Sequence, residues 1–234
     1  VSCDCWGFIA PLAAEFPNRA IEVGIAEQNL IGVAAGLALR GKIPFAIGMN
    51  TFVTMRCFEQ IRTDLGYGAR NVKVIGGYGG GIMYAAWGCT HHAIEEMALP
   101  RLVPGMTVVM PADEYETEHA IRAAAATDGP FYIALAGGAL PIDTPEAERS
   151  FELGKAVTLR EGDAATVIAV GPVVPEALRA ADLLAGKGVA VRVLNMHTIK
   201  PLDSEAILRA ARETPLIVTL EEHTIIGGLG GAVA

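Results

Sequence analysis

The sequence predicts an α/β protein made of two doubly wound domains with mainly parallel sheets. Short β-rich runs alternate with helical patterns along the whole chain, and this alternation is typical of a parallel sheet with helices on both faces. Residues 136–150, by contrast, carry glycines, prolines and charges without apolar periodicity, as a linker does. We therefore expect a first domain over 1–135, a linker over 136–150 and a smaller second domain over 151–234.

In the first domain the β-rich runs lie at residues 1–6, 20–23, 44–49, 72–77, 107–111 and 131–135. The helical patterns between them cover residues 26–40, 51–65, 91–99 and 114–127. Gly41 can end the first of these helices in the left-handed conformation, and Gly66 closes the second. Asp113, with Glu116 three residues later, has the spacing of a capping box and predicts the start of the last helix.

In the second domain the same alternation begins again on a smaller scale. We expect strands at 166–170, 189–194 and 216–222, and helices at 175–185 and 203–213. The chain ends in a glycine loop at 227–231 that opens a further helix, and it begins inside a β-rich run. Both ends therefore lie within expected elements, and we expect either that the ends are disordered or that this sequence is part of a longer polypeptide.

Composition and charge exclude several classes of partner. The 234 residues are 52% apolar with a net charge of −8, and no basic run interrupts this acidic balance. Nucleic acid and anionic membranes are poor partners for such a surface. No stretch approaches the ~20 apolar residues of a membrane span, and we expect no signal peptide.

The four cysteines are interpreted as free thiols of a reducing cytoplasm. They are Cys3, Cys5, Cys57 and Cys89. The alternative is a metal site that combines Cys3 and Cys5 with His91 and His92. Their spacing matches none of the usual zinc patterns, so we predict no metal ligands in this chain.

Glu27 is the first candidate functional residue. Helical spacing from Glu27 leads to Leu30, Ile31, Ala34 and Ala38, so the carboxylate lies on the buried stripe of its helix. The simpler interpretation is a first-turn carboxylate stabilised by the helix dipole, an effect of roughly 0.3–1 kcal/mol. A carboxylate removed from water needs a partner or it takes up a proton. Such a group can share a hydrogen bond with a ring nitrogen of a bound heterocycle.

The glycine loops and the paired histidines are weaker signals. Residues 76–81 follow a strand but do not form G-x-G-x-x-G, and no acidic residue follows at the dinucleotide-binding distance. A close backbone approach at a domain interface is the better interpretation of this loop. His91 and His92 stand together at a loop-to-helix junction, and a histidine beside a buried glutamate is a candidate proton shuttle.

Five segments in order along the chain resemble the C-terminal half of transketolases. They are "VGIAEQN", "PFAIGMNTFVTMRCFEQIRTD", "GCTHHAIEEMALPRLVPGMTVVMPADEYETEHAIRAA", "NMHTIKPLD" and "EEHTIIGGLGGAVA". The resemblance implies a pyrimidine-binding domain followed by the C-terminal domain of the family. In that family the matching glutamate bonds to the aminopyrimidine of thiamine diphosphate and favours its imino tautomer. The cofactor then serves as an electron sink.

The resemblance assigns a role to each matching residue. Glu27 and His91 match the catalytic glutamate and the histidine that reaches the substrate, and His92 is taken as structural. Phe52 matches an aromatic residue of the aminopyrimidine pocket, and Gln28 flanks the glutamate. The remaining cofactor-binding positions are Asp4, Ile25, Met49 and Met55. The two methionines stand where aromatic residues are usual, and they fit core packing as well as contact with the cofactor through sulfur.

Four substrate-binding positions depart from the family pattern. Transketolases hold the sugar phosphate with a serine, a histidine and an arginine, and bind a donor hydroxyl with an aspartate. The corresponding positions in this sequence are Phe8, Gly79, Gly137 and Trp87. Glycine cannot replace an arginine that clamps a phosphate. We therefore expect substrates that are not phosphorylated.

The chain also lacks the Gly-Asp-Gly motif with which the family binds the diphosphate and magnesium. The resemblance therefore implies a partner, an N-terminal transketolase-like subunit, in an α2β2 complex. This subunit would carry the magnesium ligands. The leading hypothesis is one subunit of a thiamine diphosphate-dependent enzyme that transfers a two-carbon ketol or acyl unit. The alternatives are the beta subunit of a 2-oxoacid dehydrogenase first component and a non-catalytic assembly subunit.

Overall fold

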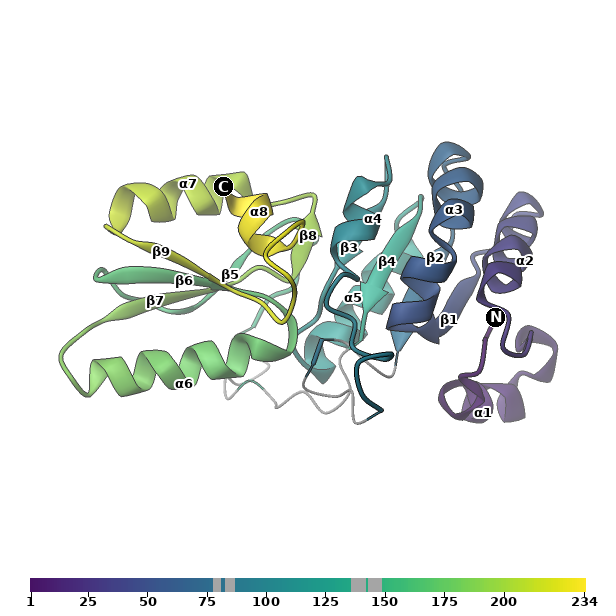
Figure 1. Ribbon diagram of the computed structural model, residues 1–234, viewed down its shortest axis with the longest axis horizontal. Helices are drawn as coiled ribbons and strands as arrows, with labels where there is room; N and C mark the ends of the chain where they lie inside the picture. The colour runs from purple at the N-terminus through teal and green to yellow at the C-terminus, as the bar shows by residue number, and fades with distance from the viewer. Residues whose placement is uncertain (78–80, 83–86, 136–141, 143–148) are drawn as a thin grey trace.

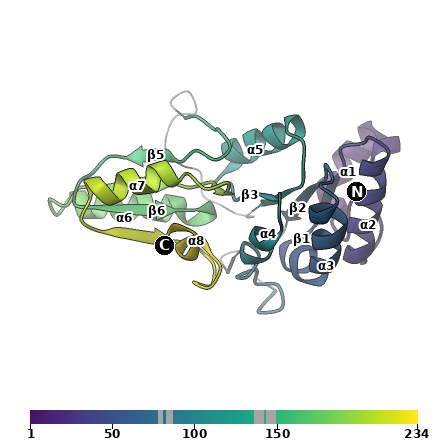
Figure 2. The ribbon, with the colours of Figure 1, turned by 90° about the horizontal axis from the view of Figure 1, so that it is seen from above.

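The computed structural model describes residues 1–77, 81–82, 87–135, 142 and 149–234. Two sheets lie one after the other along the long axis of the molecule, each with its own helices (Figure 1). The view from above shows the same division (Figure 2). The predicted fold class, two α/β domains with mainly parallel sheets, is therefore confirmed.

The first sheet has the strand order β1-β2-β4-β3-β8. Its first four strands run parallel and the last is antiparallel. The strands are β1 (Phe45–Met49), β2 (Lys73–Gly77), β4 (Phe131–Ala134), β3 (Thr107–Val109) and β8 (Thr198–Lys200). Because β8 comes from the second half of the sequence, the chain returns to complete the first sheet. This strand was not predicted, since three residues are too short to show a period.

The second sheet has the order β5-β7-β6-β9. Its strands β7, β6 and β9 are parallel, and β5 pairs with β7 in the antiparallel direction. They are β5 (Val157–Arg160), β6 (Ala165–Ala169), β7 (Val191–Asn195) and β9 (Ile217–Leu220). The three parallel strands agree with the predicted ones, whereas the edge strand β5 was missed.

Helices cover both faces of each sheet. The helices are α1 (Trp6–Glu15), α2 (Glu27–Leu39), α3 (Phe58–Gln60), α4 (Ala98–Leu102), α5 (Glu114–Ala126), α6 (Val174–Ala185), α7 (Ser204–Glu213) and α8 (Leu229–Val233). In the second domain α6 and α7 lie on opposite sides of the sheet (Figure 1). In the first domain α5 packs its Ala120 and Ala124 against one face, beside Ile133 of β4. The other face packs against Leu30 and Ile31 of α2 and the segment that contains α3.

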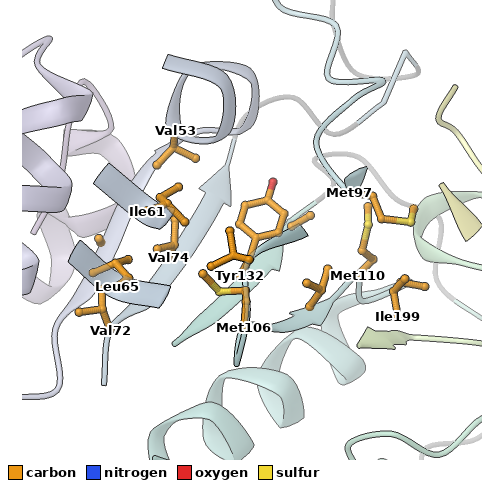
Figure 3. Packing of buried hydrophobic residues seen from close by; sticks show 14 of the residues in the cluster. Val53, Ile61, Leu65, Val72, Val74, Met97, Met106, Met110, Tyr132 and Ile199 are labelled. Carbon is orange, nitrogen blue, oxygen red and sulfur yellow. The ribbon is translucent and has the colours of Figure 1, made fainter. Parts of the chain in front are cut away.

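One hydrophobic cluster continues from the first domain into the second. Tyr132 of β4 lies within it, with its hydroxyl oxygen at the end of the ring that points away from Met106 (Figure 3). Met97, Met110 and Ile199 extend this cluster towards the second domain. Val170 and Leu229 complete it from the second domain itself. The shared core fixes the two domains against each other, because apolar side chains in contact lose area to water if they separate.

Two predicted helices differ from the structure. The expected helix at 51–65 is two π-helical stretches, Phe52–Arg56 and Ile61–Tyr67, on either side of α3. Gly66 does not end it, because the second π-helical stretch continues to Tyr67. A Cβ at Gly66 would lie 2.3 Å from a methyl carbon of Val103. The glycine is required for close packing.

The expected short helix at 91–99 is wrong, since regular helix begins only at α4. Ala93 pairs with Gly81 in an isolated bridge, which excludes a helix at that point. Two further predictions of extended chain are confirmed only in part. Residues 1–6 and 20–23 form only isolated bridges, between Ser2 and Glu22 and between Ser2 and Ile47. The helix α1 was not predicted, and Pro11 stands inside it.

The start of α5 was predicted correctly. The Asp113 side chain accepts a hydrogen bond from the Glu116 amide at 3.0 Å. Glu116 does not complete the expected capping box; its carboxylate accepts from the Ala112 amide at 2.9 Å and from the Asn195 side chain. The cap therefore also ties the first domain to β7. Within the part of the chain that is described, no helix is long and apolar enough to cross a membrane.

Candidate active site

Glu27 occupies the first position of α2 and is only 3% exposed. Leu30, Ile31 and Ala34, which share its side of the helix, are fully buried. The predicted burial of the carboxylate is thus confirmed. The start of α2 lies beside the end of β1, since a Cβ at Gly48 would lie 3.5 Å from the Leu30 side chain. Ligands of open α/β sheets bind at this carboxyl edge.

Arg56 supplies the partner that a buried carboxylate requires. Its guanidinium donates to Glu27 Oε2 at 2.7 Å and lies 4.6 Å from the centroid of the Phe52 ring. Arg56 was not predicted from the sequence. A signal was present, because Arg56 follows Phe52 by four residues and this spacing places two side chains on one helical face. Glu27, Arg56 and Phe52 therefore form one group.

His91 joins the same group through Phe52. The His91 and Phe52 rings meet edge to face with centroids 5.2 Å apart, and Trp87 meets His91 at the same distance. Thr90 Oγ1 lies 2.9 Å from His91 Nδ1. The Thr51 hydroxyl donates to the backbone carbonyl of His91 at 3.1 Å. The structure thus brings together the predicted residues Glu27, Phe52, His91 and Trp87.

Phe8 belongs to α1, and its ring packs against Gly77, the last residue of β2. A Cβ added to Gly77 would lie 3.2 Å from the Phe8 ring, so the absence of a side chain at Gly77 leaves room for this ring. Phe8 and Trp87 are 44% and 54% exposed, and both present apolar surface to solvent. Gly79 and Gly137, the other two predicted substrate positions, lie outside the described residues.

The remaining predicted cofactor positions are exposed or half-buried. Asp4 has a left-handed backbone (φ 52°), and its amide donates to a Glu22 carboxylate oxygen at 3.0 Å. The same oxygen accepts from the Gly24 amide, next to Ile25, which is 74% exposed. Met49 is half-buried at the end of β1, and Met55 is 42% exposed.

The cysteines beneath the site are buried thiols. All four cysteines of the chain are free, and only Cys89 is exposed. Burial raises the pKa of Cys3 to about 11 and that of Cys5 and Cys57 to about 12. These three thiols are therefore protonated and unreactive at neutral pH. In the described part of the chain, no three histidine, cysteine or acidic side chains form a group that could hold a metal ion.

Glu96 is a buried acid next to the site that was not singled out in the sequence. Glu96 is 2% exposed, and its Oε2 accepts from the Tyr132 hydroxyl at 2.6 Å and from the Asn50 side-chain amide. Desolvation raises the pKa of Glu96 from 4.5 to about 8, against the opposing effect of these hydrogen bonds. Asn50 directly precedes Thr51, which holds His91. The Glu96 network therefore fixes the backbone that carries the site.

We predict that Glu96→Gln removes a pH dependence of stability. The pKa of Glu96 is higher in the folded protein than in the unfolded chain. Its favourable contribution to the free energy of unfolding is therefore complete below pH 4.5 and is lost as the pH rises to about 8. The free energy of unfolding of the parent should fall relative to that of Glu96→Gln, by on the order of 4 kcal/mol across this window. Urea unfolding followed by circular dichroism at several pH values measures it. Parallel pH profiles for the two proteins would show that Glu96 does not titrate in this way.

Two domain families match this chain. The transketolase pyrimidine-binding domain family matches residues 8–142, and the transketolase C-terminal domain family matches residues 154–234. The chain belongs to the transketolase family. The resemblance found in the sequence is confirmed, and the matched regions account for both α/β domains.

The relatives of this transketolase family chain include separately encoded subunits. A 6-deoxy-6-sulfo-D-fructose transketolase subunit of Clostridium sp. (strain MSTE9) is 46% identical over 94% of this chain and 68% of its own length. An apulose-4-phosphate transketolase subunit of Phocaeicola vulgatus is 41% identical over 96% of this chain and 72% of its own.

A solved structure described as a split gene transketolase, an inactive beta4 tetramer, is 41% identical to this chain. It matches with a TM-score of 0.90 over the whole chain and 76% of its own length. The present chain is therefore a C-terminal transketolase-like subunit of a split transferase.

Proposed function

We propose that this chain supplies the aminopyrimidine half of a thiamine diphosphate site in an enzyme that transfers a two-carbon ketol or acyl unit. The observation that carries the proposal is the burial of Glu27 at the start of α2, where Arg56 links it to Phe52. Helix starts commonly hold acidic residues at the surface, where they interact with the helix dipole. A carboxylate that is 3% exposed at the carboxyl edge of a sheet instead suits a buried ligand.

The residues present fit the cofactor that the family implies. An aminopyrimidine needs a dry hydrogen-bond partner for its ring nitrogen, and Glu27 has that character. It also needs a flat apolar neighbour, which Phe52 can supply, while Met49 and Met55 offer polarisable sulfur. When bound, thiamine diphosphate supplies an ionisable ring carbon and an electron sink for the transferred unit.

The side chains of this chain then have distinct tasks. Glu27 holds a proton at the ring nitrogen, and its dry surroundings strengthen that hydrogen bond. Arg56 compensates the charge of Glu27 and packs on Phe52. His91, held by Thr51 and flanked by Phe52 and Trp87, moves a proton at a substrate oxygen. Asp4 and Ile25, which are both exposed, would be covered by the second chain in the complex.

A partner subunit would complete the site. The chain has no Gly-Asp-Gly motif, so we place the diphosphate and magnesium ligands on an N-terminal transketolase-like subunit. Two relatives are named as subunits, and the structural neighbour is described as an inactive beta4 tetramer. A closed twofold α2β2 complex is the arrangement we infer. Because all four cysteines are free thiols, we also infer a cytoplasmic location.

The substrates proposed for this enzyme are small and not phosphorylated. Phe8 and Trp87 bring large apolar side chains to positions where the family has polar ones. The names of the relatives include both a sulfo-sugar and a sugar phosphate. Donors such as hydroxypyruvate, pyruvate or an acyloin suit the apolar rings better than a phosphate does.

Reconstitution with the N-terminal subunit tests the proposed function. The complex, with thiamine diphosphate and magnesium, is expected to transfer a two-carbon unit from hydroxypyruvate to an aldehyde, and neither chain alone should do so. Calorimetry should likewise show tight cofactor binding by the complex and none by this chain. A complex that binds the cofactor without turnover would support an assembly subunit, and tight binding by the isolated chain would contradict the shared site.

A further inference from the structure

The segment from Gly81 to Ile94 carries two members of the site, Trp87 and His91. Its two ends meet in an isolated bridge, in which the Ala93 amide donates to the Gly81 carbonyl at 3.2 Å. Gly81 and Ala93 therefore lie side by side, and Trp87 and His91 stand between them in the sequence.

The second domain holds both ends of this segment. Glu222, which follows β9, accepts a hydrogen bond from the Ile82 amide at 2.7 Å. Two residues later, the Thr224 amide donates to the Ile94 carbonyl at 2.9 Å. Glu222 and Ile82 are 140 positions apart in the sequence, so this contact depends entirely on the packing of the domains.

The approach of Glu222 explains the glycine at position 81. Gly81 has a left-handed backbone (φ 61°), and a Cβ there would lie 2.3 Å from the Glu222 carboxyl carbon. A glycine that serves only a turn leaves open space beside its Cα. At Gly81 the Glu222 carboxylate fills that space. The glycine is therefore required for the contact between Glu222 and the Gly81 backbone at the domain interface.

Several hydrogen bonds hold the turn behind Glu222. Its neighbour Glu221 accepts from the amides of Leu229 and Gly230 at 2.5 and 2.9 Å, at the start of α8. Arg101 of α4 donates to the Gly228 carbonyl at 2.6 Å and so ties the same turn to the first domain. Glu222 also lines a small enclosed space with Glu96 and Met97. The end of β9 is thus fixed to the shared core.

We propose that Glu222 is a positioning residue, through which the second domain holds the Gly81–Ile94 segment and with it Trp87 and His91. The inference rests on the proposed function of His91. The first domain holds the His91 backbone through Thr51, and the second domain holds the two ends of the segment. Both anchors are needed, because a loop fixed at one side only can rotate its side chains away from the reacting atoms.

Kinetics of the reconstituted complex test this role. Glu222→Ala is expected to lower kcat/KM by roughly 10–100-fold, the size of effect that follows a misplacement of about 1 Å. Glu222→Gln keeps an oxygen that accepts from the Ile82 amide and should stay within about threefold of the parent. The affinity for thiamine diphosphate should not change, since Glu27 and Phe52 lie outside the segment. Glu161→Ala, at an exposed carboxylate of the same domain, is the control.

A second measurement needs no activity and separates this inference from the proposed function. The chain has two tryptophans, so Trp6→Phe leaves Trp87 as a single fluorophore within the segment. In this background Glu222→Ala should raise acrylamide quenching of Trp87, and Glu222→Gln should not. If Glu222→Ala leaves both kcat/KM and quenching unchanged, the inference is wrong. It is equally overturned if Glu222→Gln behaves as Glu222→Ala, because the hydrogen bond would then not be the cause.

Discussion

Glu27→Gln is expected to lower kcat of the reconstituted enzyme by on the order of 10²–10⁴-fold, the range that proton transfer by a positioned side chain supplies. Glutamine keeps the shape of the side chain and an oxygen that can accept from Arg56. Glutamine is neutral, however, and lacks the negative charge with which Glu27 would hold a proton at the cofactor ring nitrogen. The loss should therefore appear in turnover and not in folding.

Steady-state rates at saturating thiamine diphosphate and magnesium, beside circular dichroism, measure this effect. Glu59→Gln is a matched control, because Glu59 is an exposed carboxylate in α3, close in sequence to Arg56. The control should keep the rate of the parent. Activity of Glu27→Gln within a few-fold of the parent, in a folded complex, would remove Glu27 from the catalytic role.

A sugar phosphate is expected to be a poor donor. Each charge-assisted contact to a phosphate contributes ~1.5–3 kcal/mol. The loss of two cationic contacts thus corresponds to roughly 3–6 kcal/mol, or on the order of 10²–10⁴ in kcat/KM. Phe8 and Trp87 add apolar surface beside the site, so an entering phosphate would lose water without gaining a partner from them.

Competition kinetics with the reconstituted complex decide this question. Hydroxypyruvate or pyruvate should give a higher kcat/KM than xylulose 5-phosphate. The opposite order would mean that the phosphate is held by arginines of the partner, or that the four positions, Phe8, Gly79, Trp87 and Gly137, do not face the substrate. In either case the proposed substrate class would be withdrawn.

Local signals in the sequence were sufficient for much of the fold and for the centre of the site. The burial of Glu27 follows from the helical period alone, and the Asp113 cap follows from two side chains three residues apart. The central parallel strands were predicted because each is a short apolar run between turn residues. These features depend on neighbours within a few positions, which a single sequence displays directly.

The missed features depend on contacts between distant segments. The three-residue β8 exists because β3 offers it an edge, and residues 91–97 are not helical because Gly81 pairs with Ala93. The roles of Glu96 and Glu222 require the packing of Tyr132 and Ile82 against them. Glu96 stands in a stretch that was predicted as a helix, and because that helix does not form, helical spacing could not show the burial of Glu96. Among the missed site residues, only Arg56 could have been predicted, because its helical spacing from Phe52 places the two side chains on one face.

The central claim is that Glu27 binds the aminopyrimidine of thiamine diphosphate in a site shared with a second chain. A crystal structure of the reconstituted complex with the cofactor tests it most directly. The account predicts the Glu27 carboxylate within hydrogen-bond distance of the aminopyrimidine ring nitrogen, with Phe52 against the ring and the diphosphate on the partner subunit. A structure in which the cofactor lies elsewhere, while Glu27 bonds to Arg56 alone, would contradict it.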